Sequence, residues 1–289
     1  MDVCDAFCGV GGFSAGAIEA GCRVIMGIDS APVPLKVWAA NTGGTAVRAT
    51  IGVDEIKWPD ARADLHVHLS PACQVLSKAR AKAASDDAKG VALDMLRRCV
   101  ALVQRKGYTS WSIETVSTPA TVAAFRILSQ EHIDVAFATL DAADYGCPSS
   151  RVRLIASTPA LIRRLEEMPV KRVSTTDAFA AADLPLPADF LRSNTKKRDR
   201  SACVRSVQEQ AFTVTASHPL TWCDRSGVTR RCLNVKESAC LMGFRSDWML
   251  PTGQRTGQRA VGNSVPVQLS TAIMRAAFAV SASVVAAGQ

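Results

Sequence analysis

The chain has 289 residues, of which 48% are hydrophobic, so it can bury a sizeable core in one large domain or in a large domain with a small partner. The formal net charge of +8 favours an acidic partner, either nucleic acid or an anionic membrane surface, and charge alone does not choose between them. No apolar run approaches the ~20 residues of a membrane-spanning helix, and the N-terminus lacks the pattern of an export signal, so we expect an intracellular protein.

The ten cysteines are scattered through a long apolar chain and do not form paired zinc-type spacings. Cys4, Cys22, Cys99 and Cys240 lie in apolar segments, where a buried thiol is the usual role. We therefore expect reduced thiols, no metal site, and a chemical role for one or two of the ten at most.

The chain begins with a strand, a glycine-rich turn and a helix. An apolar segment opens residues 1–12 and runs into the glycines, and helix-forming residues follow over 13–20. A second apolar segment over 22–28 ends in Asp29, and an amphipathic stretch over 33–41 follows it. The strand and helix unit thus repeats.

Strands and helices continue to alternate up to about residue 158. The expected strands cover 65–69, 110–113, 133–140 and 152–156, and the expected helices cover 87–106, capped by Asp86 and Gly107, and 119–131. Such alternation predicts an α/β fold with a doubly wound, mostly parallel sheet, whose ligands bind beyond the carboxyl ends of the strands.

After about residue 159 the pattern changes to short mixed pieces, with prolines at 169, 185 and 187 and a basic cluster at 196–200. Two further helices are expected over 235–242 and 267–285. We therefore predict a large domain from residues 1–158, completed by 256–289, and a small irregular domain over 159–255.

The first candidate site is the turn DAFCGVGGF, from Asp5 to Phe13. Its glycines let the backbone approach a ligand closely, and the helix start beyond it offers free amides to a polar group. Asp29 strengthens this interpretation, because an acid at the end of the second strand can accept both hydroxyls of a ribose. A nucleoside-type cofactor is indicated, and an N-cap for the next helix is the alternative role of Asp29.

Two further side chains are expected at the same edge of the sheet. Cys73 lies in SPACQ, just past a proline-stiffened strand end, where a cysteine is placed to act as a nucleophile rather than as core. Glu114 lies in IETV at the end of the next expected strand, with a helix N-cap or a surface charge as the alternative. The pair is more informative than either residue alone.

Six sequence blocks occur in order between residues 5 and 267: DAFCGVGGF, SPACQ, IETV, SSRVR at 149–153, LNVKE at 233–237 with LMGF at 241–244, and GNSVPV at 262–267. In order and spacing they resemble the motifs of the cytosine carbon-5 methyltransferase family. The resemblance implies a class I, Rossmann-like methyltransferase that uses S-adenosylmethionine and recognises its target with the small domain.

The resemblance also implies a mechanism. Carbon-5 of cytosine is a poor nucleophile, so the thiolate of Cys73 would add to carbon-6 and raise the electron density at carbon-5. By similarity, Glu114 would bind ring nitrogen 3 and the exocyclic amine. Arg153 and Arg151 would hold the base and its neighbours, with a surface salt bridge as their alternative role.

The cofactor contacts follow from the same resemblance. The glycine-rich turn would contact the methionine end of S-adenosylmethionine, and Asp29 would contact the ribose; the product is S-adenosylhomocysteine. The cofactor-binding positions carried over from the family are Phe7, Gly9, Gly11, Gly12, Asp29, Ser30, Thr50, Asn263 and Ser264.

An enzyme of this family must take its target base out of the duplex stack. We expect a monomer whose partner is double-stranded DNA, held by cations that neutralise phosphates and make the affinity fall with salt. The candidate cations are Lys196, Lys197, Arg198, Arg200, Arg225, Arg230 and Arg231. A solvated charged face is the alternative for the cluster at 196–200.

Four positions depart from the family pattern. Ala72 replaces a second proline, Thr115 an asparagine, Ser149 a glutamine, and Thr50 the acid that meets the adenine amine. These departures leave a catalytically silent nucleic-acid-binding relative as an alternative. None of them removes the nucleophile, the glutamate or the arginines, so we expect an active enzyme.

The transfer-RNA branch of the family is the nearest rival, because it shares a serine before the proline, as in Ser70-Pro71. That branch usually carries a Cys-Phe-Thr signature after the glutamate motif, and this sequence has none. DNA is therefore the favoured substrate. The segment that would recognise the target, at about 159–211, is short, so minimal sequence recognition is expected.

Overall fold

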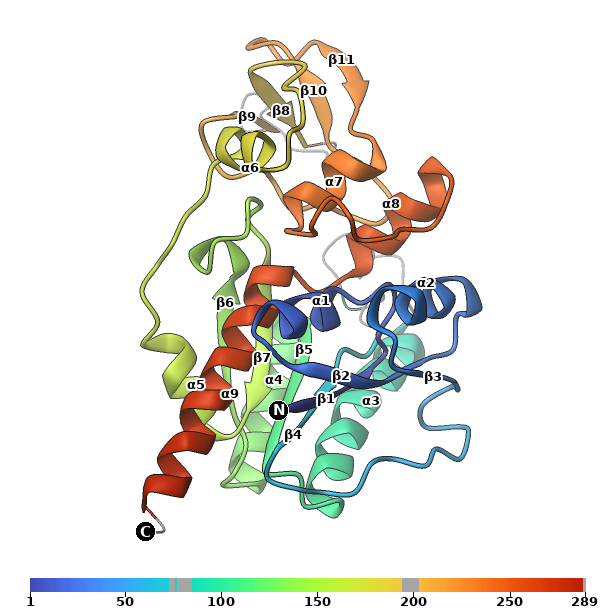
Figure 1. Cartoon of the computed structure of the whole chain (residues 1–289), viewed down its shortest axis with the longest axis vertical. Coiled ribbons are helices and arrows are strands. Elements are labelled where there is room, and N and C mark those ends of the chain that lie inside the picture. The colour runs from blue at the N-terminus through green and yellow to red at the C-terminus, as the bar shows by residue number, and fades with distance from the viewer. Residues whose placement is uncertain (73–75, 77–84, 194–202, 288–289) are drawn as a thin grey trace.

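The computed structural model describes residues 1–72, 76, 85–193 and 203–287. They form two lobes stacked along the long axis of the molecule (Figure 1). We call them the sheet lobe, residues 1–168 and 264–287, and the small lobe, residues 169–263. The sheet lobe contains both ends of the chain.

A seven-stranded mixed sheet forms the centre of the sheet lobe, in the order β3-β2-β1-β4-β5-β7-β6. The strands are β1 Asp2–Ala6, β2 Arg23–Asp29, β3 Thr45–Arg48, β4 Leu65–Leu69, β5 Ser110–Val116, β6 Ala136–Asp141 and β7 Val152–Ser157. β1 to β5 run parallel, and β7 lies antiparallel between β5 and β6. Because the strand order changes direction between β1 and β4, their carboxyl ends mark the point where ligands bind in such sheets.

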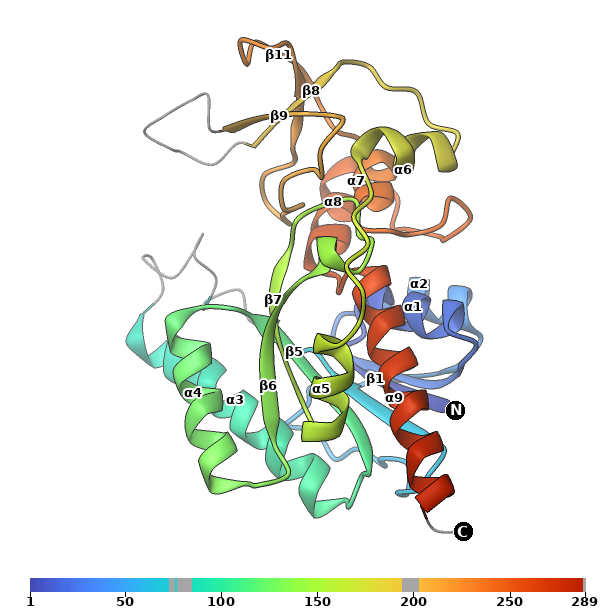
Figure 2. The ribbon, with the colours of Figure 1, turned by 90° about the vertical axis from the view of Figure 1, so that its left-hand side faces the viewer.

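Helices cover both faces of this sheet (Figure 2). One face carries α1 Gly12–Glu19, α2 Pro32–Thr42, α5 Pro159–Glu166 and α9 Val267–Ala287, and the other carries α3 Asp86–Arg105 and α4 Pro119–Glu131. Side chains of β1 alternate between the two cores, with Val3 in the first and Cys4 in the second, as the two-residue period of a strand requires. The short 3-10 helix η2 Ala142–Asp144 follows β6.

The C-terminal helix is a core element of the sheet lobe. By length and composition the stretch Gln254–Ser283 could cross a membrane, but 61% of its most apolar window is buried inside the protein. Leu269 and Ile273 on α9 are completely buried in the first core. Such burial is typical of a helix inside a folded domain.

The small lobe combines short strands with three helices among its described residues. Its sheet has the order β11-β10-β8-β9, with antiparallel neighbours. The elements are α6 Thr175–Ala181, β8 Phe190–Arg192, β9 Val204–Ser206, β10 Thr221–Cys223, β11 Thr229–Cys232, α7 Val235–Leu241 and α8 Gln254–Asn263. Trp222 is completely buried and packs edge-to-face on Phe179, with ring centroids 5.5 Å apart, at the centre of the small-lobe core.

The expected α/β architecture is confirmed, and the strands and helices expected before residue 158 all form. β3 was missed, because it is a short and largely exposed edge strand. The N-cap of α3 is Ser85 rather than Asp86, since the Ser85 hydroxyl accepts a hydrogen bond from the Ala88 amide at 3.2 Å.

The division between the lobes differs from the predicted one. Leu161 and Leu165 of α5 are buried in the first core of the sheet lobe, so the small lobe begins after α5 and not at residue 159. At the other end, α8 packs against α7, and its Val261 belongs to the small-lobe core, so most of α8 belongs to the small lobe.

Candidate functional site

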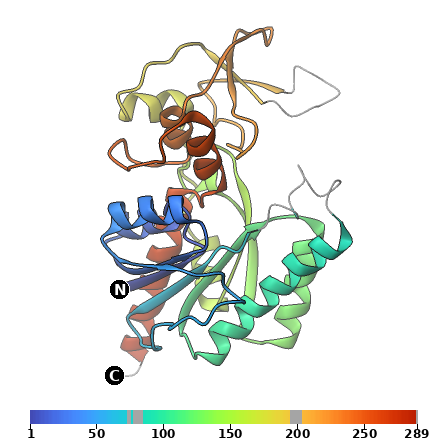
Figure 3. The same ribbon diagram turned by 90° about the vertical axis from the view of Figure 1, so that its right-hand side faces the viewer.

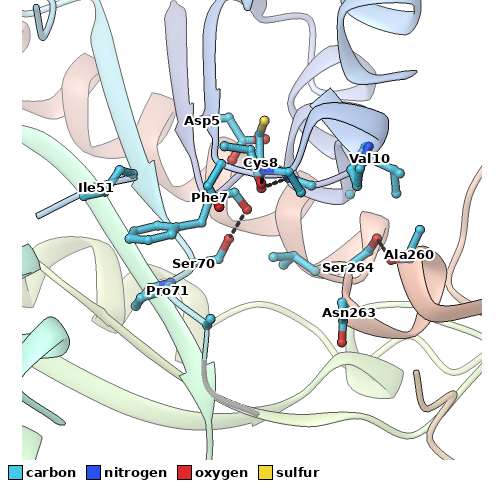
Figure 4. A pocket seen from close by; sticks show the side chains of 18 of the residues that line it. Asp5, Phe7, Cys8, Val10, Ile51, Ser70, Pro71, Ala260, Asn263 and Ser264 are labelled. Carbon is cyan, nitrogen blue, oxygen red and sulfur yellow. Dashed lines mark hydrogen bonds between the residues drawn. The ribbon is translucent and has the colours of Figure 1, made fainter. Parts of the chain in front are cut away.

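A cavity of about 880 Å³ lies at the carboxyl ends of β1 and β4 and is lined by residues of both lobes (Figure 4). Nine residues predicted for the site line it: Phe7, Gly9, Gly12, Asp29, Ser30, Thr50, Glu114, Asn263 and Ser264. Gly11, Arg151 and Arg153 are described but are not lining residues. The cavity therefore collects most of the predicted cofactor positions and one predicted catalytic residue.

The loop after β1 has an uncommon backbone. Phe7, Gly9 and Gly11 have left-handed φ angles of 60°, 54° and 88°. For a residue with a side chain, such as Phe7, this conformation is costly and is kept mainly where the surrounding structure enforces it, often at ligand sites. A Cβ atom built on Gly9 would meet no atom within 4 Å, so the loop leaves open space at this point.

Asp29, at the end of β2, holds this loop. Its Oδ2 accepts a hydrogen bond from the Gly9 amide and its Oδ1 one from the Ala31 amide, both at 2.8 Å. The N-cap of α2 is Ala31 and not Asp29. Each carboxylate oxygen keeps a further lone pair, so Asp29 can also accept from a hydroxyl group in the cavity.

The other two glycines of the loop allow close packing. A Cβ atom on Gly11 would lie 3.0 Å from the rings of both Trp248 and Trp38, so Gly11 faces two tryptophans rather than the cavity. A Cβ atom on Gly12 would overlap the backbone of Val265. Gly12 thus lets the GNSVPV segment lie directly against the loop.

Asp5 lies beneath the loop in a buried polar chain. The Ser14 hydroxyl donates to Asp5 Oδ2 at 2.6 Å, and Trp38 Nε1 donates to the Ser14 hydroxyl at 2.8 Å. Burial raises the pKa of Asp5 to about 7. Asp5 Oδ1 has no partner among the described residues, and Asp5 lines the cavity, so a ligand group could reach this carboxyl.

The predicted nucleophile Cys73 lies outside the described residues, but the segment that leads to it is described. Residues 70–72 line the cavity, and the Ser70 hydroxyl donates to the Phe7 carbonyl at 3.3 Å (Figure 4). Cys8 also lines the cavity, but burial raises the pKa of its thiol well above the ordinary value. Cys8 therefore lacks the thiolate that a nucleophile needs.

Glu114 forms a buried ion pair beside the cavity. It lies within β5, which continues to Val116, rather than at the end of the strand. Arg153 Nε lies 2.7 Å from Glu114 Oε1, and the two side chains are only 11% and 7% exposed. Solvent screens such a pair weakly, so Arg153 fixes the orientation of the carboxylate.

Arg151 has a different environment from Arg153 and does not line the cavity, so its expected contact with the base stays a prediction. Its guanidinium is buried and donates to the carbonyls of Val214 at 2.7 Å, Gly262 at 2.9 Å and Ser264 at 3.0 Å. These bonds direct the charge into the junction between the lobes. Arg151 precedes β7, so its side chain does not follow the alternation of side chains along that strand. Arg153 lies within β7 and is placed beside Glu114.

The predicted phosphate-binding cations divide into three groups. Lys196, Lys197, Arg198 and Arg200 lie outside the described residues. Arg225 and Arg230 are exposed, and neither forms an ion pair with a described residue. Arg231 is paired with both carboxylate oxygens of Glu237, at 2.8 and 2.6 Å, so its charge is neutralised within the protein.

The sequence interpretation missed the contribution of α8. Thr256 and Arg259 line the cavity from this helix, and Arg259 is exposed. The polar stretch at 254–259 shows no apolar period, and proximity to the GNSVPV block was the nearest usable signal. Among the residues that the structure describes, no group of three or more His, Cys, Asp or Glu side chains could hold a metal ion.

The sequence also matches a family as a whole. The sequence model of the C-5 cytosine-specific DNA methylase family matches residues 1–178 and 186–279, which cover both lobes. A comparison with curated proteins finds no match.

Several solved structures share the fold, and each covers 96% of this chain. A protein described as a DNA modification methyltransferase encoded within a prophage, from E. coli, is 18% identical, with a TM-score of 0.65 over 99% of its own chain. A mutant of Spodoptera frugiperda DNMT2 is 17% identical, with a TM-score of 0.61 over 99% of its chain. The S. pombe Dnmt2 methyltransferase is 15% identical, with a TM-score of 0.58 over 98% of its chain. At these identities the likeness establishes the fold.

Proposed function

Because the chain belongs to the C-5 cytosine-specific DNA methylase family, we propose that it is a DNA (cytosine-5-)-methyltransferase. It methylates carbon-5 of a cytosine that has been turned out of double-stranded DNA. The observation that carries the proposal is the buried pair of Glu114 and Arg153, beside the cavity that the segment leading to Cys73 also lines. The pair supplies a fixed carboxylate for the base, and the segment supplies the nucleophile.

S-adenosylmethionine is the methyl donor of this family and supplies the methyl group when it is bound. The residues of the cavity fit a nucleoside of this kind. Gly9 leaves open space, Asp29 can accept from ribose hydroxyls, and Phe7 and Ile51 offer apolar surface to a base. Thr50, where the family has an acid, offers a hydroxyl to the adenine amine instead.

In the proposed mechanism the side chains of the chain activate the pyrimidine ring. The Cys73 thiolate adds to carbon-6, which raises the electron density at carbon-5. Glu114 is held in place by Arg153. One carboxyl oxygen accepts a hydrogen bond from the exocyclic amine, and the carboxyl group passes a proton to ring nitrogen 3 as negative charge develops there. After methylation, the proton on carbon-5 is removed and Cys73 leaves carbon-6.

Duplex DNA is the preferred substrate in this proposal. The Cys-Phe-Thr signature of the transfer-RNA branch does not occur in the sequence. Arg225 and Arg230 on the small lobe and Arg259 at the cavity are exposed cations that can neutralise phosphates. These cations support a nucleic-acid partner in general, so the choice between DNA and RNA rests on the sequence signature.

A catalytically silent relative is the second candidate, and the positions that depart from the family favour it. The Thr115 hydroxyl is buried without a partner among the described residues. Ser149 donates to the Leu241 carbonyl at 2.7 Å, so it serves the junction between the lobes rather than the cavity. The retained Glu114 and Cys73 support activity over this alternative.

A transfer assay separates these candidates. Purified protein is incubated with S-adenosylmethionine labelled in the methyl group and with either genomic duplex DNA from a methylation-free host or unmodified transfer RNA. We expect label in DNA, located at carbon-5 of cytosine by bisulfite sequencing. Label in transfer RNA alone would assign the chain to the other branch, and no label in either would support the silent relative.

We also infer that the enzyme acts as a monomer. The support is that the two lobes of one chain line the whole described cavity, so no second copy is needed to complete it. Light scattering of the purified protein at working concentration should give the mass of one chain, and a stable dimer would contradict the inference.

A further inference from the structure

The loop between α7 and α8 connects the small lobe to the sheet lobe at a second place, away from Arg151. Figures 1 and 3 show this loop above α1 and α2. The Met249 amide donates to Asn41 Oδ1 at 2.9 Å, and Asn41 Nδ2 donates to the Met249 carbonyl at 2.9 Å. The side chain of Asn41, on α2, thus pairs with the loop backbone in both directions.

Trp248, the preceding residue, contacts the loop after β1 directly. Its Nε1 donates to the Val10 carbonyl at 3.0 Å. Its ring lies so close to Gly11 that a Cβ atom there would be 3.0 Å from Trp248 Cζ2. Trp248 also packs against Phe244, with ring centroids 6.0 Å apart, so it is anchored in its own lobe.

Val10 belongs to two parts of the molecule at once. It is 1% exposed and lies in the apolar core of the small lobe, although it follows β1 of the sheet lobe. It also lines the cavity, between Gly9 and Gly12, which line it as well. The conformation of this loop therefore depends on the docked small lobe.

We propose that Trp248 is a positioning residue for the cofactor: its hydrogen bond to Val10 and its packing on Gly11 hold the loop after β1 in the conformation that binds S-adenosylmethionine. The inference rests on the proposed function and deepens it, because it names a residue that positions the loop for the methyl donor. Trp248 is not among the residues that line the cavity, so it acts through the loop backbone. A tryptophan of purely structural role would stabilise the fold without changing cofactor affinity.

The test is the substitution Trp248→Phe, which keeps an aromatic ring and removes the N–H donor. Binding of S-adenosylhomocysteine is measured by titration calorimetry in the absence of nucleic acid. Because a single hydrogen bond contributes modestly, the dissociation constant should rise about three- to tenfold. With an active preparation, KM for S-adenosylmethionine should rise by a similar factor while kcat changes little.

Trp58→Phe is the matched control, because Trp58 is a partly buried tryptophan that packs against the second core of the sheet lobe. It should leave the dissociation constant of S-adenosylhomocysteine unchanged. A lower melting temperature of Trp248→Phe with unchanged affinity would overturn the proposal and leave a structural role.

Asn41→Ala is a second variant that tests the same loop, and it can be measured even if Trp248→Phe does not fold. It removes both bonds to Met249 and should weaken S-adenosylhomocysteine binding through the same loop. In the double variant the two effects should be less than additive. Unchanged affinity in Asn41→Ala, or strict additivity, would contradict the proposal, whereas the choice of DNA or RNA as substrate affects none of these results.

Discussion

The two lobes contribute different surfaces to the same cavity. The sheet lobe contributes backbone, apolar side chains, and carboxyl groups that internal bonds hold, such as Asp5 with Ser14 and Glu114 with Arg153. The small lobe contributes Arg259, an exposed cation. Chemistry on a base requires fixed and weakly solvated groups, whereas phosphate binding works with exposed flexible cations. We infer that the sheet lobe supplies the groups for the reaction and that Arg259 of the small lobe contributes to nucleic-acid affinity.

The junction between the lobes combines apolar packing, such as that of Val10 in the small-lobe core, with hydrogen bonds between backbone groups. The Ser150 amide donates to the Ala211 carbonyl at 2.9 Å, and the Ala211 amide donates to the Pro148 carbonyl at 2.8 Å. Arg151 adds bonds to both sides of the same junction. The lobes are therefore expected to keep one relative position.

The largest effect is expected for the fixed carboxylate of the sheet lobe. Glu114→Gln keeps the shape but cannot pass a proton to ring nitrogen 3, so the methyl-transfer rate should fall by about 10²- to 10³-fold. Single-turnover kinetics with labelled cofactor measure this rate. The exposed Glu167, changed to Gln, is the control and should have little effect. An equal loss of methyl-transfer rate in the two variants would contradict a special role for the fixed carboxyl group.

The junction is the next test. Arg151→Met removes a buried donor to three carbonyls, so the free energy of unfolding should fall by about 2–4 kcal/mol. Urea unfolding measures the change. Arg172→Met breaks an exposed pair with Asp144 and should cost less than about 1 kcal/mol. If Arg151→Met instead kept its stability and lost only activity, the result would support the expectation that Arg151 holds the base.

The dependence of stability on pH tests the environment of Asp5, a buried carboxyl group at the cavity. Its pKa is raised from 3.8 to about 7, so the folded state binds a proton that the unfolded state has released. Its contribution to stability is therefore complete below about pH 4 and is lost as the pH rises through about 7. Asp5→Asn should flatten this decline in unfolding experiments between about pH 5 and pH 8. Identical pH profiles for the variant and the parent chain would contradict a raised pKa of Asp5.

The smallest effect is expected on the exposed side of the small lobe. Arg225→Gln should reduce the slope of log affinity against log salt concentration for duplex DNA by about 0.9, the value for one phosphate contact. Arg231→Gln should change the slope less, because Glu237 already neutralises Arg231. Fluorescence anisotropy at several salt concentrations measures both slopes. A larger change for Arg231 would mean that the ion pair opens when nucleic acid binds.

The sequence predicted the sheet lobe well, for a physical reason. Its strands and helices are long and buried, so apolar periodicity marks them, and glycines and Asp29 mark the strand ends that meet at the cavity. In the small lobe, β8, β9 and β10 have three residues each, which is too short for a period to appear. Their formation depends on tertiary packing around Trp222.

Side-chain direction was the part of the site that the sequence could not give. Arg151 and Arg153 are two residues apart and were assigned one role, yet one enters the junction and the other meets Glu114. The contact of Trp248 with Val10 could not be predicted either, because the two residues are far apart in the chain. Contacts of this kind depend on where the lobes meet, which no local pattern encodes.

The central claim is that Cys73 attacks a cytosine turned out of DNA, and a mechanism-based trap tests it most directly. Duplexes of random sequence that contain 5-fluorocytosine are incubated with the protein and S-adenosylmethionine and are then denatured, since fluorine at carbon-5 cannot leave as the proton does. We expect an adduct that survives denaturation with the parent chain and none with Cys73→Ser. An adduct that persists in Cys73→Ser, or none with the parent chain on any duplex, would contradict it.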